Sequence, residues 1–182
     1  MSMHSDLPKN RLACISQIEC AFAACEKPTL DKLAPDGGID GPYVIKNWGH
    51  LTRETVLELP YFGNYHGEDL SYMSSSGIRY FLPSILILFL RHPENIENEG
   101  FACLVTRLEG VFGCRKKTPH YRQIRLVSAQ REAIHEWCGQ IMTILRKFKL
   151  GPWQAEQMAR LKALRRAART NATDHDYEDL AP

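Results

Sequence analysis

The segment from Ser74 to Arg91, SSSGIRYFLPSILILFLR, is the most apolar stretch of the chain and decides its fold. Serine side chains accept hydrogen bonds from the free N–H groups of a first helical turn, so the three serines predict a helix start. Pro93 and the cationic Arg91 predict where the helix ends. Because apolar residues cover nearly all sides of this helix, we predict a buried core helix at about residues 75–91. Pro83 falls near its first turns, where it can kink the axis.

Further helices are predicted on both sides of the core helix. Apolar residues recur at helical spacing in several segments, and glycine or proline separates these segments. The expected helices cover residues 10–25, 53–59, 94–110, 128–148 and 152–169. Turn formers dominate 28–47, and an aromatic loop at 60–67 leads to the core helix. We find no convincing strand pair, so the expected class is all-α: a single compact helical domain with long loops and little or no β structure.

Length and composition predict one soluble domain. The 182 residues contain 44% hydrophobic and 24% charged residues, which is ordinary for a globular protein. The expected organisation is a flexible N-terminus at 1–9, a helical core domain at 10–150, a basic C-terminal helix at 151–169 and an acidic flexible tail at 170–182. The apolar run is shorter than the roughly 18–20 residues of a membrane span, so we expect no membrane contact.

The compartment is predicted from the N-terminus and the cysteines. The first residues show no secretory signal pattern. Six cysteines without such a signal are more typical of reduced thiols than of a disulfide framework. None forms a zinc-ligand or redox spacing, so buried small hydrophobic residues are the preferred interpretation. The predicted localisation is cytoplasmic.

Charge is segregated along the chain. Residues 1–106 hold 8 Lys or Arg against 13 Asp or Glu, whereas residues 107–169 hold 15 against 4. Candidate contacts for nucleic acid or an acidic partner are Arg146, Lys147, Lys149, Arg160, Lys162, Arg165, Arg166 and Arg169. Such clusters can bind phosphate backbones, but no recognition-helix or RNA motif accompanies them. The alternative is a solvated helix face paired with the acidic half or covered by the acidic tail.

A second candidate lies at the start of the core helix. Glu68 and Asp69 precede it, and Arg79 and Tyr80 lie within it. An arginine near a buried helix needs a carboxylate, because an unpaired buried charge is very costly. We therefore predict a structural ion pair between Asp69 (or Glu68) and Arg79. A polar ligand site at these four residues is the alternative.

Motifs for metals and cofactors are incomplete. Glu132 and His135 have the Glu-x-x-His spacing of di-iron bundles, but the chain has one such pair where two are needed. His135-Glu136 opens like a zinc-protease motif, yet Gly139 stands where the second histidine belongs. A solvated helix face is the preferred interpretation, with no metal and no cofactor.

Several segments together resemble a bacterial family catalogued as domain of unknown function 6714. The resemblance covers about residues 15–145, with the basic last helix and the acidic tail outside it. The matching segments are Asp69–Met73, Arg79–Pro83, Ile18–Phe22, Trp48 and Ser128–Gln130. It implies a bacterial origin and supports the helical fold, and no catalytic residue carries over.

The leading functional hypothesis is a non-catalytic protein-interaction or accessory protein that binds another protein. A role of the immunity or defence type is an analogy from small bacterial domains. The first alternative is a nucleic-acid-associated protein that uses the basic C-terminal helices. The second is an enzyme whose site is assembled from scattered residues near 61–69. The sequence predicts no oligomeric state.

Overall fold

The structure, a computed structural model, describes residues 7–34, 40–59, 61–114, 124, 126–148 and 151–170. Within these ranges every regular element is a helix and no strand forms, so the predicted all-α class is confirmed. The elements are α1 (Lys9–Phe22), α2 (Leu30–Leu33), α3 (Gly41–Trp48), α4 (Arg53–Leu57), α5 (Asn64–Tyr72), α6 (Ser75–Arg91), the 3-10 helix η1 (Pro93–Glu97), α7 (Glu99–Val111), α8 (Ser128–Leu145) and α9 (Pro152–Arg169). None of the described helices combines the length and apolar character needed to cross a membrane.

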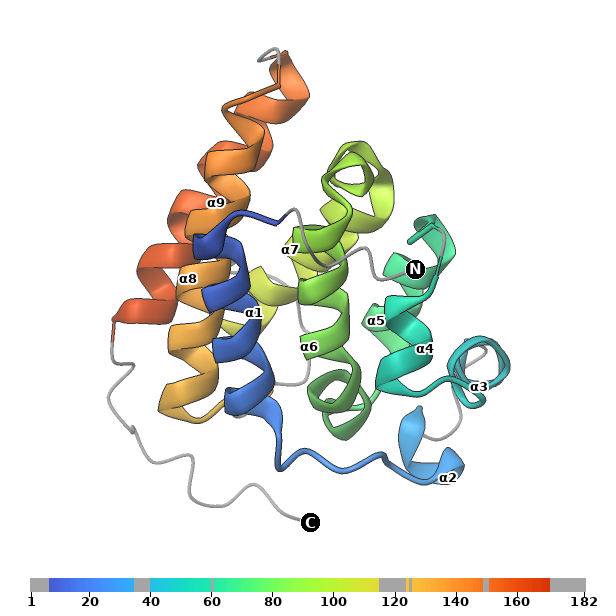
Figure 1. Cartoon of the computed structure of the whole chain (residues 1–182). Coiled ribbons are helices and arrows are strands. Elements are labelled where there is room, and N and C mark those ends of the chain that lie inside the picture. Colours follow the sequence, from blue (N-terminus) through green and yellow to red (C-terminus); the bar gives the residue numbers. More distant parts are fainter. Residues whose placement is uncertain are drawn as a thin grey trace.

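The predicted core helix is confirmed as α6, which runs through the middle of the molecule (Figure 1). Every residue from Phe81 to Leu90 is buried. The backbone N–H of Gly77 donates to Oγ of Ser74 at 3.0 Å, so the serine cap is also confirmed. Burying each large apolar side chain contributes about 1.5–3 kcal/mol, and α6 buries such side chains on every face. The helix is therefore the hydrophobic centre of the domain.

Pro83 lies inside α6, and a side chain from another helix donates a hydrogen bond close to it. Proline has no N–H, so the carbonyl of Arg79 loses its helical donor. The next carbonyl, that of Tyr80, accepts a hydrogen bond from Nε of Arg53 at 2.8 Å. The same guanidinium donates to the carbonyl of Phe22, the last residue of α1, at 3.0 Å. Arg53 therefore ties α4 to α6 and to the end of α1.

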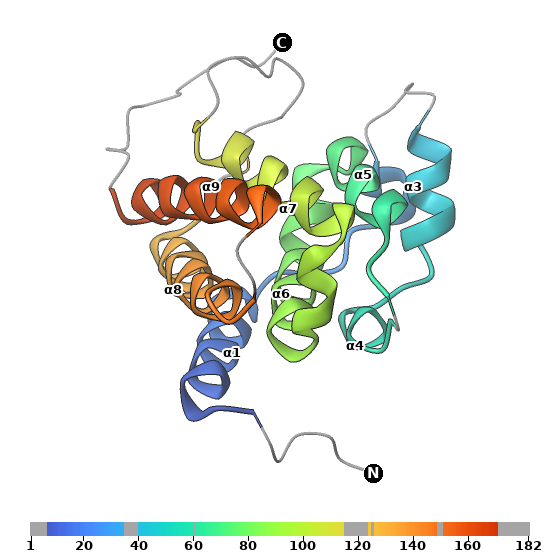
Figure 2. The same cartoon turned by 90° about the horizontal axis from the view of Figure 1, so that it is seen from above.

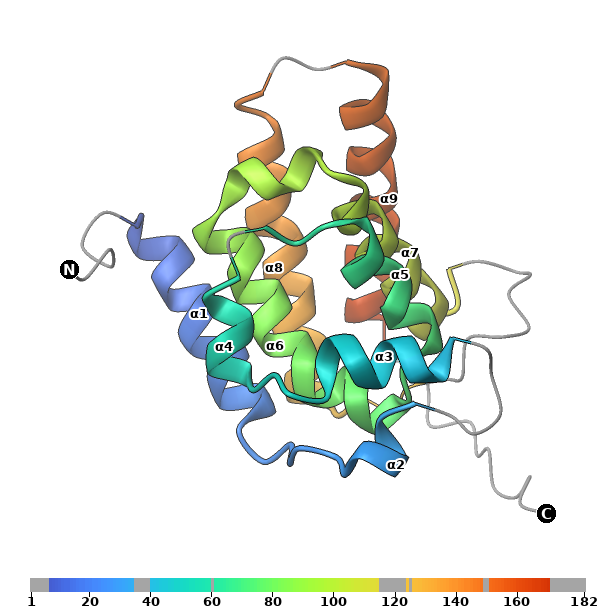
Figure 3. The same ribbon diagram turned by 90° about the vertical axis from the view of Figure 1, so that its right-hand side faces the viewer.

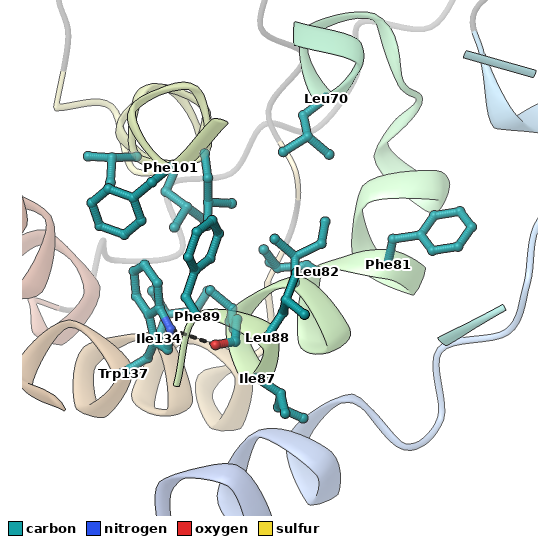
Figure 4. Packing of buried hydrophobic residues seen from close by; sticks show 14 of the residues in the cluster. Leu70, Phe81, Leu82, Ile87, Leu88, Phe89, Phe101, Ile134 and Trp137 are labelled. Carbon is teal, nitrogen blue, oxygen red and sulfur yellow. Dashed lines mark hydrogen bonds between the residues drawn. The ribbon is translucent and has the colours of Figure 1, made fainter. Parts of the chain in front are cut away.

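Two groups of helices enclose α6 (Figure 2). Helices α1, α8 and α9 lie on one side, and α3, α4 and α5 lie on the other. Helices α1, α4 and α8 each contact α6. Helix α7 reaches it through aromatic rings, with the centroids of Phe89 and Phe101 5.1 Å apart. From α8, the indole N–H of Trp137 donates to the carbonyl of Leu86 at 3.0 Å (Figure 4).

The basic C-terminal helix α9 completes the core. It packs along α8 and also contacts α7. Leu161, Leu164 and Ala168 are buried in this contact. Pro152 opens the helix as predicted, in the first turn where its missing N–H costs nothing.

The segment 28–47 was predicted as a loop, and this prediction is wrong. It contains α2 and most of α3. Val44 and Trp48, one helical turn apart, are fully buried and fix α3 against the core. Pro42 stands in its first turn, where proline favours a helix start. The segment therefore contributes two short helices to the fold.

The aromatic loop predicted at 60–67 is also wrong, because α5 begins at Asn64. Its Gly67 lies against Gly100 of α7, and a Cβ atom on Gly67 would come within 2.8 Å of the Gly100 Cα atom. A glycine that suggested a loop in the sequence instead permits two helices to approach closely.

Helix ends differ from the expected ones where a polar side chain intervenes. Asn98 accepts a hydrogen bond from the N–H of Phe101 at 3.0 Å, which separates η1 from α7 within the single helix expected there. Ser128 was expected to cap α8 but is its first residue. Oε1 of Gln130 instead accepts from the N–H of Val127 at 3.2 Å. The first helix was predicted to end at residue 25, and it ends three residues earlier, at Phe22.

The expected terminal segments lie mostly outside the described residues. Helix α1 already begins at Lys9, within the N-terminus that was predicted to be flexible. Residues 171–182, which hold the acidic tail, are outside the described part of the chain.

Candidate functional site

Glu68 and Asp69, which were predicted to hold the core helix, differ in their exposure to solvent. On α5, Asp69 is buried and Glu68 is exposed. Oδ2 of Asp69 accepts a hydrogen bond from Nδ2 of Asn47 at 2.8 Å and one from Nε1 of Trp48 at 3.0 Å. Both donors lie on α3. The carboxylate therefore joins α5 to α3.

The predicted ion pair between Asp69 or Glu68 and Arg79 is wrong. The side chain of Arg79 is exposed, and among the described residues it makes no ion pair. A hydrated guanidinium needs no carboxylate, because the cost of an unpaired charge arises only on burial. Tyr80 is half-buried, and its ring lies 4.8 Å from the guanidinium carbon of Arg53. These four residues therefore do not converge on one ligand site.

His66 packs beside the Asp69 network in an aromatic setting. Its ring stacks on Phe62 with centroids 5.5 Å apart and meets Trp48 edge-on at 5.8 Å. Burial lowers the pKa of His66, and the nearby charge of Asp69 opposes this effect. Burial also raises the pKa of Asp69, against the effect of its two hydrogen bonds. Opposed shifts of this kind occur at functional sites and also in buried structural networks.

The hypothesis of an enzyme site near residues 61–69 stays a prediction. Tyr61 is 52% exposed, whereas His66 and Asp69 are buried. The tyrosine and the two titratable groups therefore differ in their access to solvent.

The predicted basic cluster includes one residue with a structural role. Nε and Nη2 of Arg160 donate to the two carboxylate oxygens of Glu109 on α7 at 3.1 and 2.9 Å. Nη2 also donates to Oγ1 of Thr106 at 2.6 Å. Both charged side chains are largely buried, with 13% and 7% of their surface exposed. Arg160 therefore fastens α9 to α7 and is not available to phosphate groups.

Three other basic residues of α9 share one exposed face. Lys162, Arg166 and Arg169 are exposed and follow the i, i+4, i+7 spacing of a helical stripe. We call this set the basic stripe. Arg165 is turned toward α8, where its Nη2 lies 4.0 Å from Oε1 of Glu136.

The remaining basic residues lie far from the basic stripe. Arg146 and Lys147 are exposed just after α8. They lie near the start of α9, whose 18 residues extend over about 27 Å. Lys149 is outside the described residues. The eight candidates do not form one patch.

Helix α8 carries the single group of potential metal ligands found among the described residues. Glu132, His135 and Glu136 each place one ligand atom within 4.8 Å of the others. Two incomplete sequence motifs, Glu132 with His135 and His135 with Glu136, drew attention to these residues separately, and the helix places all three on one face.

Two of the described cysteines are buried in the core. Cys14 and Cys138 are buried, as expected, while Cys20 is exposed. Burial, with a smaller contribution from the charge of Glu136, raises the pKa of Cys14 to about 12. Burial likewise raises the pKa of Cys138. Both thiols stay protonated at neutral pH, so they behave as small apolar side chains.

Large apolar side chains that reach the surface are concentrated on one part of the molecule. Those exposed outside this part are Leu12 of α1 and Val127 before α8. The others lie between residues 30 and 72, and they are Leu30, Tyr43, Tyr61 and Tyr72. Sequence analysis missed this grouping, because Leu30, Tyr43 and Tyr61 belong to segments that it assigned to loops.

No protein-family profile, no curated protein and no solved structure matches this chain. The resemblance to domain of unknown function 6714 therefore stays a prediction.

Proposed function

We propose that this protein is a non-catalytic interaction protein that binds another protein chain through the surface formed by α2, α3 and α5. The observation that supports the proposal is the concentration of exposed Leu30, Tyr43, Tyr61 and Tyr72 in this part of the chain. Tyrosine is enriched in protein interfaces, because its ring provides apolar contact area while its hydroxyl group remains hydrogen-bonded.

Two of the tyrosines border the junction of α3 and α5. Tyr43 lies one turn before Asn47 on the same face of α3, and Tyr72 lies one turn after Asp69 on α5. The hydrogen bond from Asn47 to Asp69 joins these two faces. In Figure 3, α3 crosses the front of the molecule with α5 beside it and α2 below. The hydrogen bond therefore fixes the positions of the two helices that carry Tyr43 and Tyr72.

Charge favours a protein partner on this surface over nucleic acid. Residues 1–106, which contain all of α2 to α5, hold 13 acidic and 8 basic residues. A net negative surface repels a phosphate backbone, whereas it attracts a partner protein with basic residues around its apolar contact.

The test compares partners captured by matched variants. Tagged full-length protein, the double variant Tyr43→Ala/Tyr72→Ala and the control Leu12→Ala would be expressed in the source cell and purified with their partners. Leu12 is exposed to a similar degree but lies on α1. We expect a partner that copurifies with the wild type and with Leu12→Ala and is lost from the double variant. An identical set of partners for all three proteins would contradict the proposed surface.

A second candidate function, binding of nucleic acid, is favoured by the basic stripe. Lys162, Arg166 and Arg169 present three cations on one exposed helical face. Binding through such a face falls steeply with salt, because it releases counterions from the phosphates. We expect the triple Glu variant of the stripe to lose binding to duplex DNA or single-stranded RNA. The control Arg146→Glu/Lys147→Glu changes two distant cations, and no binding by wild type at low salt would remove this candidate.

A further inference from the structure

We propose that α8 carries a binding site for a divalent transition metal, formed by Glu132, His135 and Glu136. These residues stand at positions i, i+3 and i+4, so their side chains leave the same face of the helix. One ligand atom from each lies within 4.8 Å of the other two. A small rotation of the exposed Glu132 side chain can close this set around one ion.

The orientation of His135 supports the site independently of the two carboxylates. Only 9% of its side-chain surface is exposed. Its Nδ1 lies 2.9 Å from the carbonyl oxygen of Arg165 on α9. A carbonyl only accepts hydrogen bonds, so Nδ1 carries the proton and the neutral ring keeps its lone pair on Nε2. Metal-binding histidines are commonly held in this way by a backbone carbonyl.

The free lone pair of His135 is directed at the carboxylates. Nε2 lies 3.7 Å from Oε1 of Glu136, which is beyond hydrogen-bonding distance. Among the described residues Nε2 makes no hydrogen bond. A cation between Nε2 and the carboxylate oxygens would be bound by all three groups at once.

The ligand chemistry selects the class of metal. One imidazole nitrogen with two carboxylates suits Zn²⁺, Co²⁺ or Mn²⁺, whereas Ca²⁺ and Mg²⁺ prefer oxygen ligands alone. Three protein ligands leave at least one coordination position for water or for a group from a partner. The sequence motif was set aside because a second Glu-x-x-His pair is missing, and Glu136 supplies the additional carboxylate from the same helix.

Arg165 competes with the metal for Glu136. Its Nη2 lies 4.0 Å from the same Oε1 atom, so the guanidinium balances the carboxylate charge when no ion is bound. The guanidinium lies over Gly139, where a Cβ atom would come within 3.2 Å of the Arg165 Cζ atom. A bound cation would be repelled by this nearby positive charge. The proposal therefore predicts that Arg165→Gln binds the metal more tightly than the wild type does.

The test is calorimetric titration of chelator-treated, full-length protein with Zn²⁺, together with the visible absorption of bound Co²⁺. We expect one ion per chain in the wild type. Glu132→Gln should weaken binding by at least about tenfold, the loss typical of disturbing a metal site. Because Glu132 is exposed, this variant should fold normally, whereas His135→Gln changes a buried position.

The control is Glu156→Gln, which removes an exposed carboxylate from α9 and should leave the affinity unchanged. If the wild type binds no ion, or if Glu132→Gln binds as tightly as the wild type, the site does not exist. If Arg165→Gln binds no more tightly than the wild type, Arg165 does not compete with the metal for Glu136, and Glu136 is not a ligand of the ion. Neither result affects the proposed protein-binding surface on α2, α3 and α5, which the tyrosine variants test separately.

Discussion

The indole N–H of Trp48 and the carboxylate of Asp69 form a buried hydrogen bond of 3.0 Å that joins α3 to α5. Asn47 donates to the same oxygen at 2.8 Å, so consecutive residues of one helix bind one acceptor of another. Trp48 itself is fully buried and contacts the rings of Phe62, His66 and Phe81. The bond therefore determines how the part of the molecule with the exposed tyrosines is attached to the core.

Asp69→Ala should lower the free energy of unfolding by about 1–3 kcal/mol, because the buried donor of Trp48 and the partly buried donor of Asn47 lose their acceptor. Asp69→Asn keeps a carbonyl oxygen in place and removes a buried charge, so its loss should be clearly smaller. Urea unfolding followed by circular dichroism measures both variants. Equal losses for Ala and Asn would show that the carboxylate charge matters more than its role as an acceptor.

The pair of Arg160 and Glu109 should behave as a buried ion pair. Replacing one partner, in Arg160→Met, removes the largely buried cation that donates two hydrogen bonds to Glu109 and should cost about 3–5 kcal/mol. The double variant Arg160→Met/Glu109→Leu should recover much of this loss, since both charges of the pair are then removed together. Arg166→Met, on the exposed face of the same helix, is the control and should stay within about 0.5 kcal/mol of wild type. Additive losses in the double variant would contradict the pairing.

Gly67→Ala should be destabilising by about 1–3 kcal/mol, because its Cβ atom would overlap the backbone of Gly100. Backbone atoms cannot move aside without separating α5 from α7. Gly139→Ala is the matched control, since it too lies within a helix but its nearest neighbour is the side chain of Arg165. In thermal unfolding, the melting temperature of Gly139→Ala should be well above that of Gly67→Ala. A lower melting temperature for Gly139→Ala would contradict the close contact between α5 and α7.

Stability should decrease in mild acid because of His66. Burial lowers the pKa of this group below its usual 6.5 in the folded protein. Between the two pKa values the unfolded chain binds more protons, so the free energy of unfolding falls as the pH falls below about 6.5. His66→Gln removes this contribution, and its stability should change less between pH 7.5 and pH 5. An unchanged pH profile in the variant would show that other groups control the acid response.

The sequence predicted the parts of the fold whose signal is local. The serine cap of Ser74 and the continuous apolar run after it specify α6 without reference to the rest of the chain. Helices α3 and α5 were missed because each is short and relies on distant contacts. Trp48 stabilises α3 through Asp69, and Gly67 is favourable in α5 because Gly100 lies opposite. Neither relationship has a local sequence signature.

The candidate sites were harder to predict for the same reason. A run of basic residues does not reveal which of them is paired, and Glu109, the partner of Arg160, lies 51 residues away. The i, i+3 spacing of Thr106 to Glu109 was the available signal for a polar patch on α7. The expected pairing of Arg79 failed because a helix that is buried over most of its length still exposes part of its first turns.

The position of α1 has a consequence for the order in which the chain folds during synthesis. Its buried Ile18 and Phe22 belong to a helix that packs on α6 and α8, and the second of these begins at Ser128. At about 5–20 residues per second, a ribosome needs roughly 5–20 s to make the intervening hundred or so residues. During that time α1 can pack on α6, but the part of its apolar face that α8 covers has no partner. A nascent chain that stops before Ser128 should therefore expose this part and bind chaperones until α8 has been made.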